Sequence, residues 1–190
     1  MARFLLQLVA LQLIFIVGVF SLFASKKVED AVKYQLQQKV LTLGSSYTIK
    51  DDKDKAVYKV GFKQLGLGKH LQITDPTGKQ EYYSIKHILN PLGLAKYEIR
   101  QNDKVVADIS RKMNLIGGKK FSVKSKFGTY KIEGNFRSRE FKIKKEHHLV
   151  ATISKKFFAI GDKYGVKIQR GEDTPFILAL AIVVDEVAHD

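Results

Sequence analysis

The sequence contains no cysteine. A chain without a thiol can form no disulfide framework, no thiolate metal site and no cysteine nucleophile. The short motifs of several common chemistries are also missing: the Gly-x-Ser-x-Gly elbow, the His-Glu-x-x-His zinc motif, the phosphate-binding Gly-Lys-Ser/Thr loop and the dinucleotide fingerprint. We therefore expect no catalytic residues, no metal and no cofactor, and interpret the protein as non-enzymatic.

Three segments resemble binding motifs only superficially. Residues 65–70 read Leu-Gly-Leu-Gly-Lys-His but lack the helix that a phosphate loop requires, which favours a hairpin turn. Asp52 and Asp54 match the start of a calcium loop, but its later Gly and Glu are missing, so we expect a solvated turn. His147 and His148 are adjacent, and neighbours on a strand point to opposite faces, which indicates a polar turn rather than a metal pair.

Acidic residues are scarce in one part of the chain. The formal net charge is +14, and residues 111–170 hold 17 Lys and Arg against only 4 Asp and Glu. Such asymmetry indicates a polyanionic partner, such as anionic lipid, nucleic acid or a cell-wall polymer. Lysines on the solvent faces of strands could equally serve to keep a sheet-rich protein soluble and its edges unpaired.

The chain repeats a two-strand phrase about six times. An alternating apolar strand leads to a glycine turn, and an aromatic-x-Ile or similar strand follows. The second strands contain Tyr47-x-Ile49, Leu71-x-Ile73, Tyr97-x-Ile99, Phe121-x-Val123, Phe141-x-Ile143 and Tyr164-x-Val166. In the fifth phrase Arg137-Ser138-Arg139 replaces the glycine. A period of about 24 residues with internal alternation predicts roughly twelve strands, and a meander of that length closes into a barrel to remove its edges.

The N-terminal segment has a different character. Residues 4–25 carry no charge and are long enough to span about 30 Å of hydrocarbon as a helix, so we expect a transmembrane anchor over 1–25. A cleaved signal peptide is the alternative, but its apolar region would be unusually long and its cleavage site poor. We assign 26–33 to a linker and 34–190 to the β domain. Lys26, Lys27 and Lys33 outnumber Arg3, which favours a cytoplasmic domain in a single-pass protein.

The last strand leads into an apolar segment. Thr174 and Pro175 have the chemistry of an N-cap and a first helical residue, and residues 176–184 are all apolar. A helix that is apolar all round must be buried all round, and this one is too short to cross a bilayer. We therefore expect a helix inside the barrel. A strand at the sheet edge is the alternative, because Ile182, Val183 and Val184 are β-branched.

These features resemble the LURP-one-related family. The resemblance rests on the repeated hairpins, the phrase from Leu43 to Asp51, the segment 158–164 and the terminal apolar helix. It implies the tubby-like fold of that superfamily, which also contains the phospholipid scramblases: a closed antiparallel barrel of about twelve strands around a C-terminal helix. It implies little about activity. Tubby domains bind phosphoinositides through basic surface residues, but no motif here allows individual ligand residues to be transferred.

The candidate site is a basic surface on the second half of the barrel. It comprises Lys119, Lys120, Lys124, Lys126, Arg137, Arg139, Lys142, Lys144, Lys145, Lys155 and Lys156. Arg137 and Arg139 are the most specific suggestion of an anion site, because Arg can bind phosphate through two hydrogen bonds, although an ordinary exposed turn is the simpler interpretation. We expect these residues to contact anionic lipid headgroups at the membrane, or cell-wall polyanions if the domain faces outward.

Two other functions stay open. Basic strands with Tyr and Phe could bind nucleic acid by stacking, but the aromatic residues occupy inward positions, and a membrane anchor does not suit this role. Scramblase-like lipid handling has only the superfamily resemblance to support it. The sequence gives no indication of a protein partner.

Overall fold

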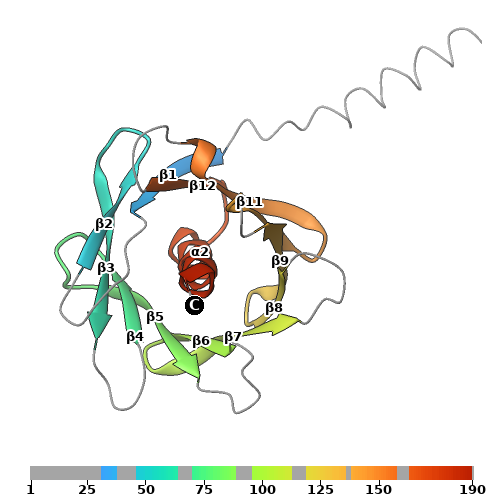
Figure 1. Cartoon of the computed structure of the whole chain (residues 1–190). Coiled ribbons are helices and arrows are strands. Elements are labelled where there is room, and N and C mark those ends of the chain that lie inside the picture. The colour runs from blue at the N-terminus through green and yellow to red at the C-terminus, as the bar shows by residue number, and fades with distance from the viewer. Residues whose placement is uncertain are drawn as a thin grey trace, which may run out of the picture. The chain divides into compact units, whose positions relative to one another are not determined.

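The computed structural model describes residues 31–37, 46–63, 70–88, 96–112, 119–135, 138–157 and 163–189. These residues form twelve antiparallel strands that close into one barrel in chain order, with β12 next to β1 (Figure 1). The strands are β1 (Ala31–Gln37), β2 (Ser46–Asp51), β3 (Ala56–Lys63), β4 (His70–Thr74), β5 (Glu81–Ile88), β6 (Lys96–Gln101), β7 (Lys104–Lys112), β8 (Lys119–Ser125), β9 (Gly128–Asn135), β10 (Glu140–Lys145), β11 (His148–Ser154) and β12 (Lys163–Gln169). The predicted closed barrel is confirmed.

Strict alternation places the apolar residues inside. In β10, Phe141 and Ile143 are buried, whereas Lys142 between them is exposed. The aromatic residue and the Ile of each repeated phrase point inward in the same way, because successive side chains of a strand face opposite sides of a sheet. The repeat therefore encodes the barrel lining.

Helix α2 (Thr174–His189) fills the barrel and is seen end-on at its centre in Figure 1. Every residue from Phe176 to Val184 is at most 2% exposed. Because these residues are buried all round the helix, the barrel wall must surround it on all sides. Burying each Leu, Ile, Val or Phe side chain contributes about 1.5–3 kcal/mol. The central helix is confirmed, and the edge-strand alternative is wrong.

The cap of α2 differs from the sequence prediction. Asp173, not Thr174, is the N-cap: its Oδ1 accepts a hydrogen bond of 3.0 Å from the Phe176 amide, and its carbonyl accepts the Ile177 amide at 3.0 Å. A carboxylate accepts this bond as well as a hydroxyl does and also complements the helix dipole. The helix therefore begins with Thr174 at its first position and Pro175 at its second.

The two ends of the barrel differ. One end, here called the polar-turn end, carries the short hairpins β2–β3, β4–β5, β6–β7, β8–β9 and β10–β11 and the connection to α2. Gly78 donates its amide to the Asp75 carbonyl at 3.0 Å in one of these turns, and in the solvated turn expected at Asp52 and Asp54 the Asp51 carboxylate accepts the Lys53 and Lys55 amides. The glycine turns of the repeat lie outside the described residues.

The predicted transmembrane segment also lies outside the described residues. Within the ranges that the structure does describe, no helix combines the length and the apolarity needed to cross a bilayer. Strand β1 begins at Ala31, inside the range assigned to the linker, and pairs Tyr34 with Asp51. The start of β1 therefore lies at the polar-turn end.

A candidate polyanion-binding surface

Five lysines gather on the outside of three neighbouring strands, β8, β9 and β10. These lysines, called here the β8–β10 face, are Lys120, Lys124, Lys131, Lys142 and Lys144. They point outward because the residues that alternate with them, such as Phe121 and Ile132, line the core. Two glutamates, Glu133 and Glu140, share the face, so positive charge is in excess.

The strand register determines how these charges meet. Lys120 and Lys142 pair with Glu133 from either side, whereas Lys131 lies directly opposite Lys144. Like charges directly opposite each other on adjacent strands destabilise a sheet. An anion bound between Lys131 and Lys144 would relieve that repulsion.

Glu133 organises the centre of the face. Its Oε2 lies 3.1 Å from the Lys144 Nζ, and its Oε1 lies 3.5 Å from the Lys120 Nζ. The hydrogen bond from Lys144, with the positive charges of Lys144 and Lys120, lowers the pKa of Glu133 below its usual range. The carboxylate therefore stays ionised at neutral pH and holds two of the five lysines in place.

A shallow hollow of about 370 Å³ opens over this part of the sheet. It is lined by Thr129, Lys131, Glu133, Lys144, Glu146 and His147. The hollow lies outside the barrel and is wide enough for a small polar headgroup.

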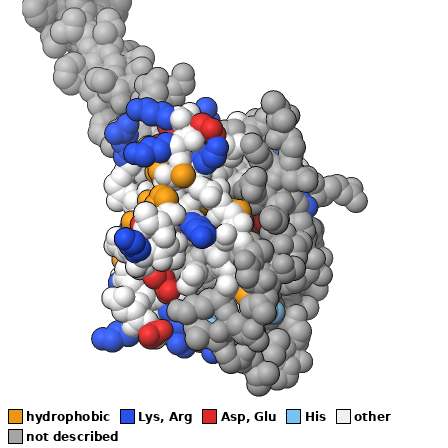
Figure 2. All heavy atoms as spheres, turned by 90° about the vertical axis from the view of Figure 1, so that its left-hand side faces the viewer, with side chains coloured by type: hydrophobic (Ala, Val, Ile, Leu, Met, Phe, Trp, Pro, Cys, Tyr) orange, Lys and Arg blue, Asp and Glu red, His pale blue; other side chains and the backbone are white. Residues whose placement is uncertain are grey.

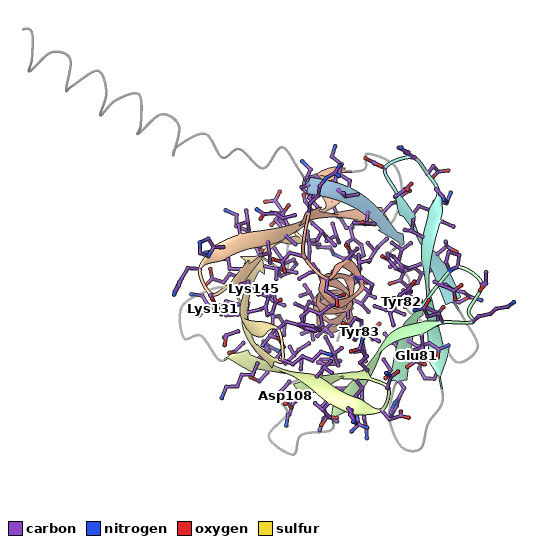
Figure 3. The ribbon with its side chains drawn as sticks, turned by 180° about the vertical axis from the view of Figure 1, so that it is seen from behind. Glu81, Tyr82, Tyr83, Asp108, Lys131 and Lys145 are labelled. Carbon is purple, nitrogen blue, oxygen red and sulfur yellow. The ribbon has the colours of Figure 1, made fainter. Side chains whose placement is uncertain are left out.

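Two of the predicted lysines lie away from this face, at the polar-turn end. The Lys126 Nζ donates a 2.6 Å hydrogen bond to Gln101 and lies 4.8 Å from the centre of the Phe127 ring. The Lys145 Nζ lies 3.9 Å from Glu172 and 5.7 Å from the centre of the Tyr130 ring, and Figure 3 labels this lysine together with Lys131. Both ammonium groups already have partners within the fold.

Arg139 does not join the lysines either. It adopts a positive φ of 50° in the turn before β10 and lines a cavity of only about 10 Å³ with Tyr164 and Asp185, beside the C-terminal end of α2. Its Nη1 atom is buried. The structure therefore orients this arginine toward the barrel interior, away from the outer face where an anion-binding turn was predicted.

The remaining predicted residues are only partly described. The backbones of Lys119 in β8 and of Lys155 and Lys156 in the 3₁₀ turn η1 (Lys155–Phe157) are described, but the side chains of Lys119 and Lys156 are not. Arg137 lies outside the described residues.

Two lysines that the sequence prediction missed extend the surface. Lys131 lies at its centre, and Lys167 of β12 pairs with Thr152, which in turn pairs with Lys142. The alternation would have identified Lys131, because it stands between the inward residues Tyr130 and Ile132.

The opposite side of the barrel has a different surface. Figure 2 shows the side formed by β2, β3 and β4, where blue basic and red acidic side chains occur together among the described residues. The β8–β10 face, by comparison, carries five lysines against two glutamates.

A barrel of twelve antiparallel strands around its own C-terminal helix defines the class of this protein. The family model described as LURP-one-related matches residues 32–185, and the chain belongs to this family. The uncharacterised protein YxjI of Bacillus subtilis is 30% identical over 155 residues, which cover 82% of this chain and 93% of YxjI. A protein from Arabidopsis thaliana with a crystal structure shares the fold: its TM-score is 0.58 at 15% identity, covering 83% of this chain and 91% of that one.

Proposed function

We propose that this protein is a membrane-anchored binding module whose β8–β10 face engages anionic lipid headgroups. The observation that supports the proposal best is the cross-strand pair Lys131 and Lys144, set among three further lysines on one face. Their strands place the two lysines directly opposite each other, and a phosphate bound between them would be stabilised by both ammonium groups, of which that of Lys144 also contacts Glu133.

The filled interior makes an outer site the natural one. In many small barrels the ligand enters the lumen, but here α2 occupies it, and the cavity beside Tyr164 is large enough for about one water molecule. Around the described residues, the two larger hollows lie on the outside of the barrel, which favours an outer site for a larger ligand.

The magnitude of the effect suits a tethered domain. Each lysine near an anionic leaflet contributes about 1 kcal/mol, and this attraction decays within about 8–10 Å at physiological salt. If residues 4–25 span the bilayer, residues 26–30 can separate β1 from the membrane by at most roughly 20 Å. The high local concentration of lipid would then make weak contacts sufficient.

Binding to nucleic acid has less support. The tyrosines and phenylalanines of the repeated phrases, such as Tyr47, Tyr97 and Phe121, are at most 6% exposed and cannot stack on bases. The partly buried rings of Tyr34, Tyr58 and Tyr82 pack against one another and come from β1, β3 and β5, away from the lysine-rich face.

The test is co-sedimentation of residues 26–190 with neutral and anionic vesicles at low and high salt. The variant Lys124→Gln/Lys131→Gln/Lys142→Gln should lose most of the binding to anionic vesicles. The matched control Lys55→Gln/Lys59→Gln/Lys86→Gln removes the same charge from β3, β5 and the turn before β3, and should retain it. Equal losses in the two variants would indicate that only net charge matters and would contradict a specific face.

A further inference from the structure

A second hollow lies beside the β8–β10 face and differs from it in chemistry. It measures about 530 Å³, within the range of about 300–1,000 Å³ that is usual for small-molecule sites. Its lining includes Asn135, Ser138, Glu140, Lys142, Thr152 and Phe157. We call it the Phe157 groove.

The strand register explains why the surface is hollow at this point. Asn135 of β9 pairs with Glu140 of β10, and Ser154 of β11 pairs with Gly165 of β12. The outer surface here carries mostly short side chains, so its floor is low. The Phe157 ring, on the 3₁₀ turn that follows β11, stands above this floor as a wall.

The wall is held in a fixed position. The Lys167 Nζ lies 4.5 Å from the centre of the Phe157 ring. Lys167 comes from β12, whereas the groove extends over β9, β10 and β11. The Lys167 ammonium group therefore contacts the Phe157 ring from the side of β12. The cation–π attraction between them favours one orientation of the ring.

The groove carries little net charge. Among the described lining residues, the acids Glu133 and Glu140 accompany a single base, Lys142, and Glu133 is also bound to Lys120 and Lys144. Positive side chains do not outnumber negative ones in this lining, so it does not favour a dianionic phosphate. It does offer hydroxyl, amide, carboxylate and ammonium groups close together, and so can both donate hydrogen bonds to a ligand and accept them.

From this combination we infer that the Phe157 groove binds an uncharged sugar ring. A saccharide presents hydroxyl groups that donate and accept hydrogen bonds at its edge, which suits Glu140, Lys142 and Thr152. Its C–H face carries partial positive charge and packs against the negative face of an aromatic ring such as Phe157. The groove shares Lys142 and Glu140 with the proposed lipid-binding face but takes a different ligand, and sugar binding does not depend on lipid binding.

The experiment is saturation-transfer NMR on the full-length chain in a detergent whose headgroup contains no sugar. The probes are glucose, galactose, mannose and N-acetylglucosamine, each at about 10 mM, which would nearly saturate a site with a dissociation constant of about 1 mM. Glucose 6-phosphate serves as the charged comparison. We expect transfer to the ring C–H protons of at least one neutral sugar, with equal intensity at low and high salt.

Three variants locate the binding. Phe157→Leu keeps an apolar side chain but removes the ring, and Glu140→Gln keeps the shape but removes the carboxylate; each should weaken binding several-fold. Lys59→Gln, on β3 and away from the groove, should leave it unchanged. The inference is overturned if no neutral sugar gives a signal, if the signal is the same in Phe157→Leu and Glu140→Gln, or if only glucose 6-phosphate binds and salt abolishes it.

Discussion

The hydroxyl of Tyr83 donates a 2.6 Å hydrogen bond to Oδ2 of Asp173, the N-cap residue of the central helix. The two carboxylate oxygens of Asp173 therefore join the barrel wall at β5 to the first turn of α2. The Tyr83 ring also contacts the Phe176 ring, with 5.7 Å between their centres, and Figure 3 shows Tyr83 on the inner side of the wall, toward the helix. This contact fixes where the helix enters the barrel.

Replacing Tyr83 by Phe should test this link. The variant keeps the ring contact but removes the donor to Asp173, and we expect the free energy of unfolding to fall by about 1.5–3 kcal/mol, as for a hydrogen bond to a charged group. Chemical denaturation of residues 26–190 measures the loss. Tyr82→Phe, on the partly buried neighbouring ring, is the control and should stay within about 0.5 kcal/mol of the parent. Equal values for the two variants would show that the hydrogen bond does not stabilise the helix entrance.

Gly134 in β9 should tolerate no side chain. A Cβ atom there would clash with the Glu140 carbonyl oxygen and lie 2.5 Å from Cδ1 of Phe141, so the backbone of β10 would have to move. We expect Gly134→Ala to lower the free energy of unfolding by about 1–3 kcal/mol or more.

Gly61 in β3 provides the matched control for that substitution. The nearest atom to a Cβ at Gly61 is Nε2 of Gln72, at 3.6 Å, an ordinary contact with a flexible side chain. Gly61→Ala should therefore be close to neutral, or slightly stabilising because glycine costs entropy in a strand. A loss in Gly61→Ala as large as in Gly134→Ala would contradict the close approach of β9 and β10.

The contrast between Gly134 and the glycine turns shows what the sequence could predict. Alternation of Tyr, Phe and Ile predicted the number of strands, the closed barrel and the inward residues, because burial requires a period of two along a strand. The all-apolar segment predicted the central helix for the same reason. Alternation could not predict that Gly134 must lack a side chain, because this depends on how closely β10 approaches β9. Nor could it predict the inward orientation of the Arg139 side chain, where the backbone has a positive φ.

The lysines illustrate the same limit on a surface. The sequence indicated that residues 111–170 carry the positive charge, and four of the predicted lysines do lie together on the β8–β10 face. Lys126 and Lys145 lie at the ends of strands, where Lys126 contacts the Phe127 ring and Lys145 contacts the Glu172 carboxylate. The partners Gln101 of Lys126 and Glu172 of Lys145 are distant in sequence, so a list of basic positions cannot show which lysines these groups contact.

Buried tyrosines should make the fold sensitive to alkali. Burial raises the pKa of Tyr130 to about 12, with a further contribution from Glu172 and Asp173, and burial similarly raises the pKa of Tyr58 to about 12. A folded-state pKa above the ordinary value near 10 contributes stability that is complete below pH 10 and is lost as the pH rises toward 12. We expect tyrosinate absorbance and loss of near-ultraviolet circular dichroism to rise together in that interval. Ionisation of Tyr58 and Tyr130 near pH 10 with the fold intact, seen as the absorbance that is lost in Tyr58→Phe and Tyr130→Phe, would contradict their burial.

The strongest test of the β8–β10 face is a substitution that should improve binding. Glu133→Gln removes the central negative charge and releases Lys120 and Lys144, so affinity for anionic vesicles at low salt should rise by about fivefold, corresponding to about 1 kcal/mol per charge. Both ion pairs are partly exposed, so the cost in stability should stay below about 1 kcal/mol. Because the two lysines lower the pKa of Glu133, that cost should be present at neutral pH and vanish as the pH falls through this pKa.

Glu81→Gln is the control for that gain. It makes the same change of charge on β5, at the polar-turn end and away from the lysine-rich face. Vesicle co-sedimentation of the two variants at low and high salt separates a local effect from one of net charge. If Glu81→Gln raises the affinity as much as Glu133→Gln does, the membrane responds to the charge of the whole barrel, and the opposed pair Lys131 and Lys144 has no special role in binding.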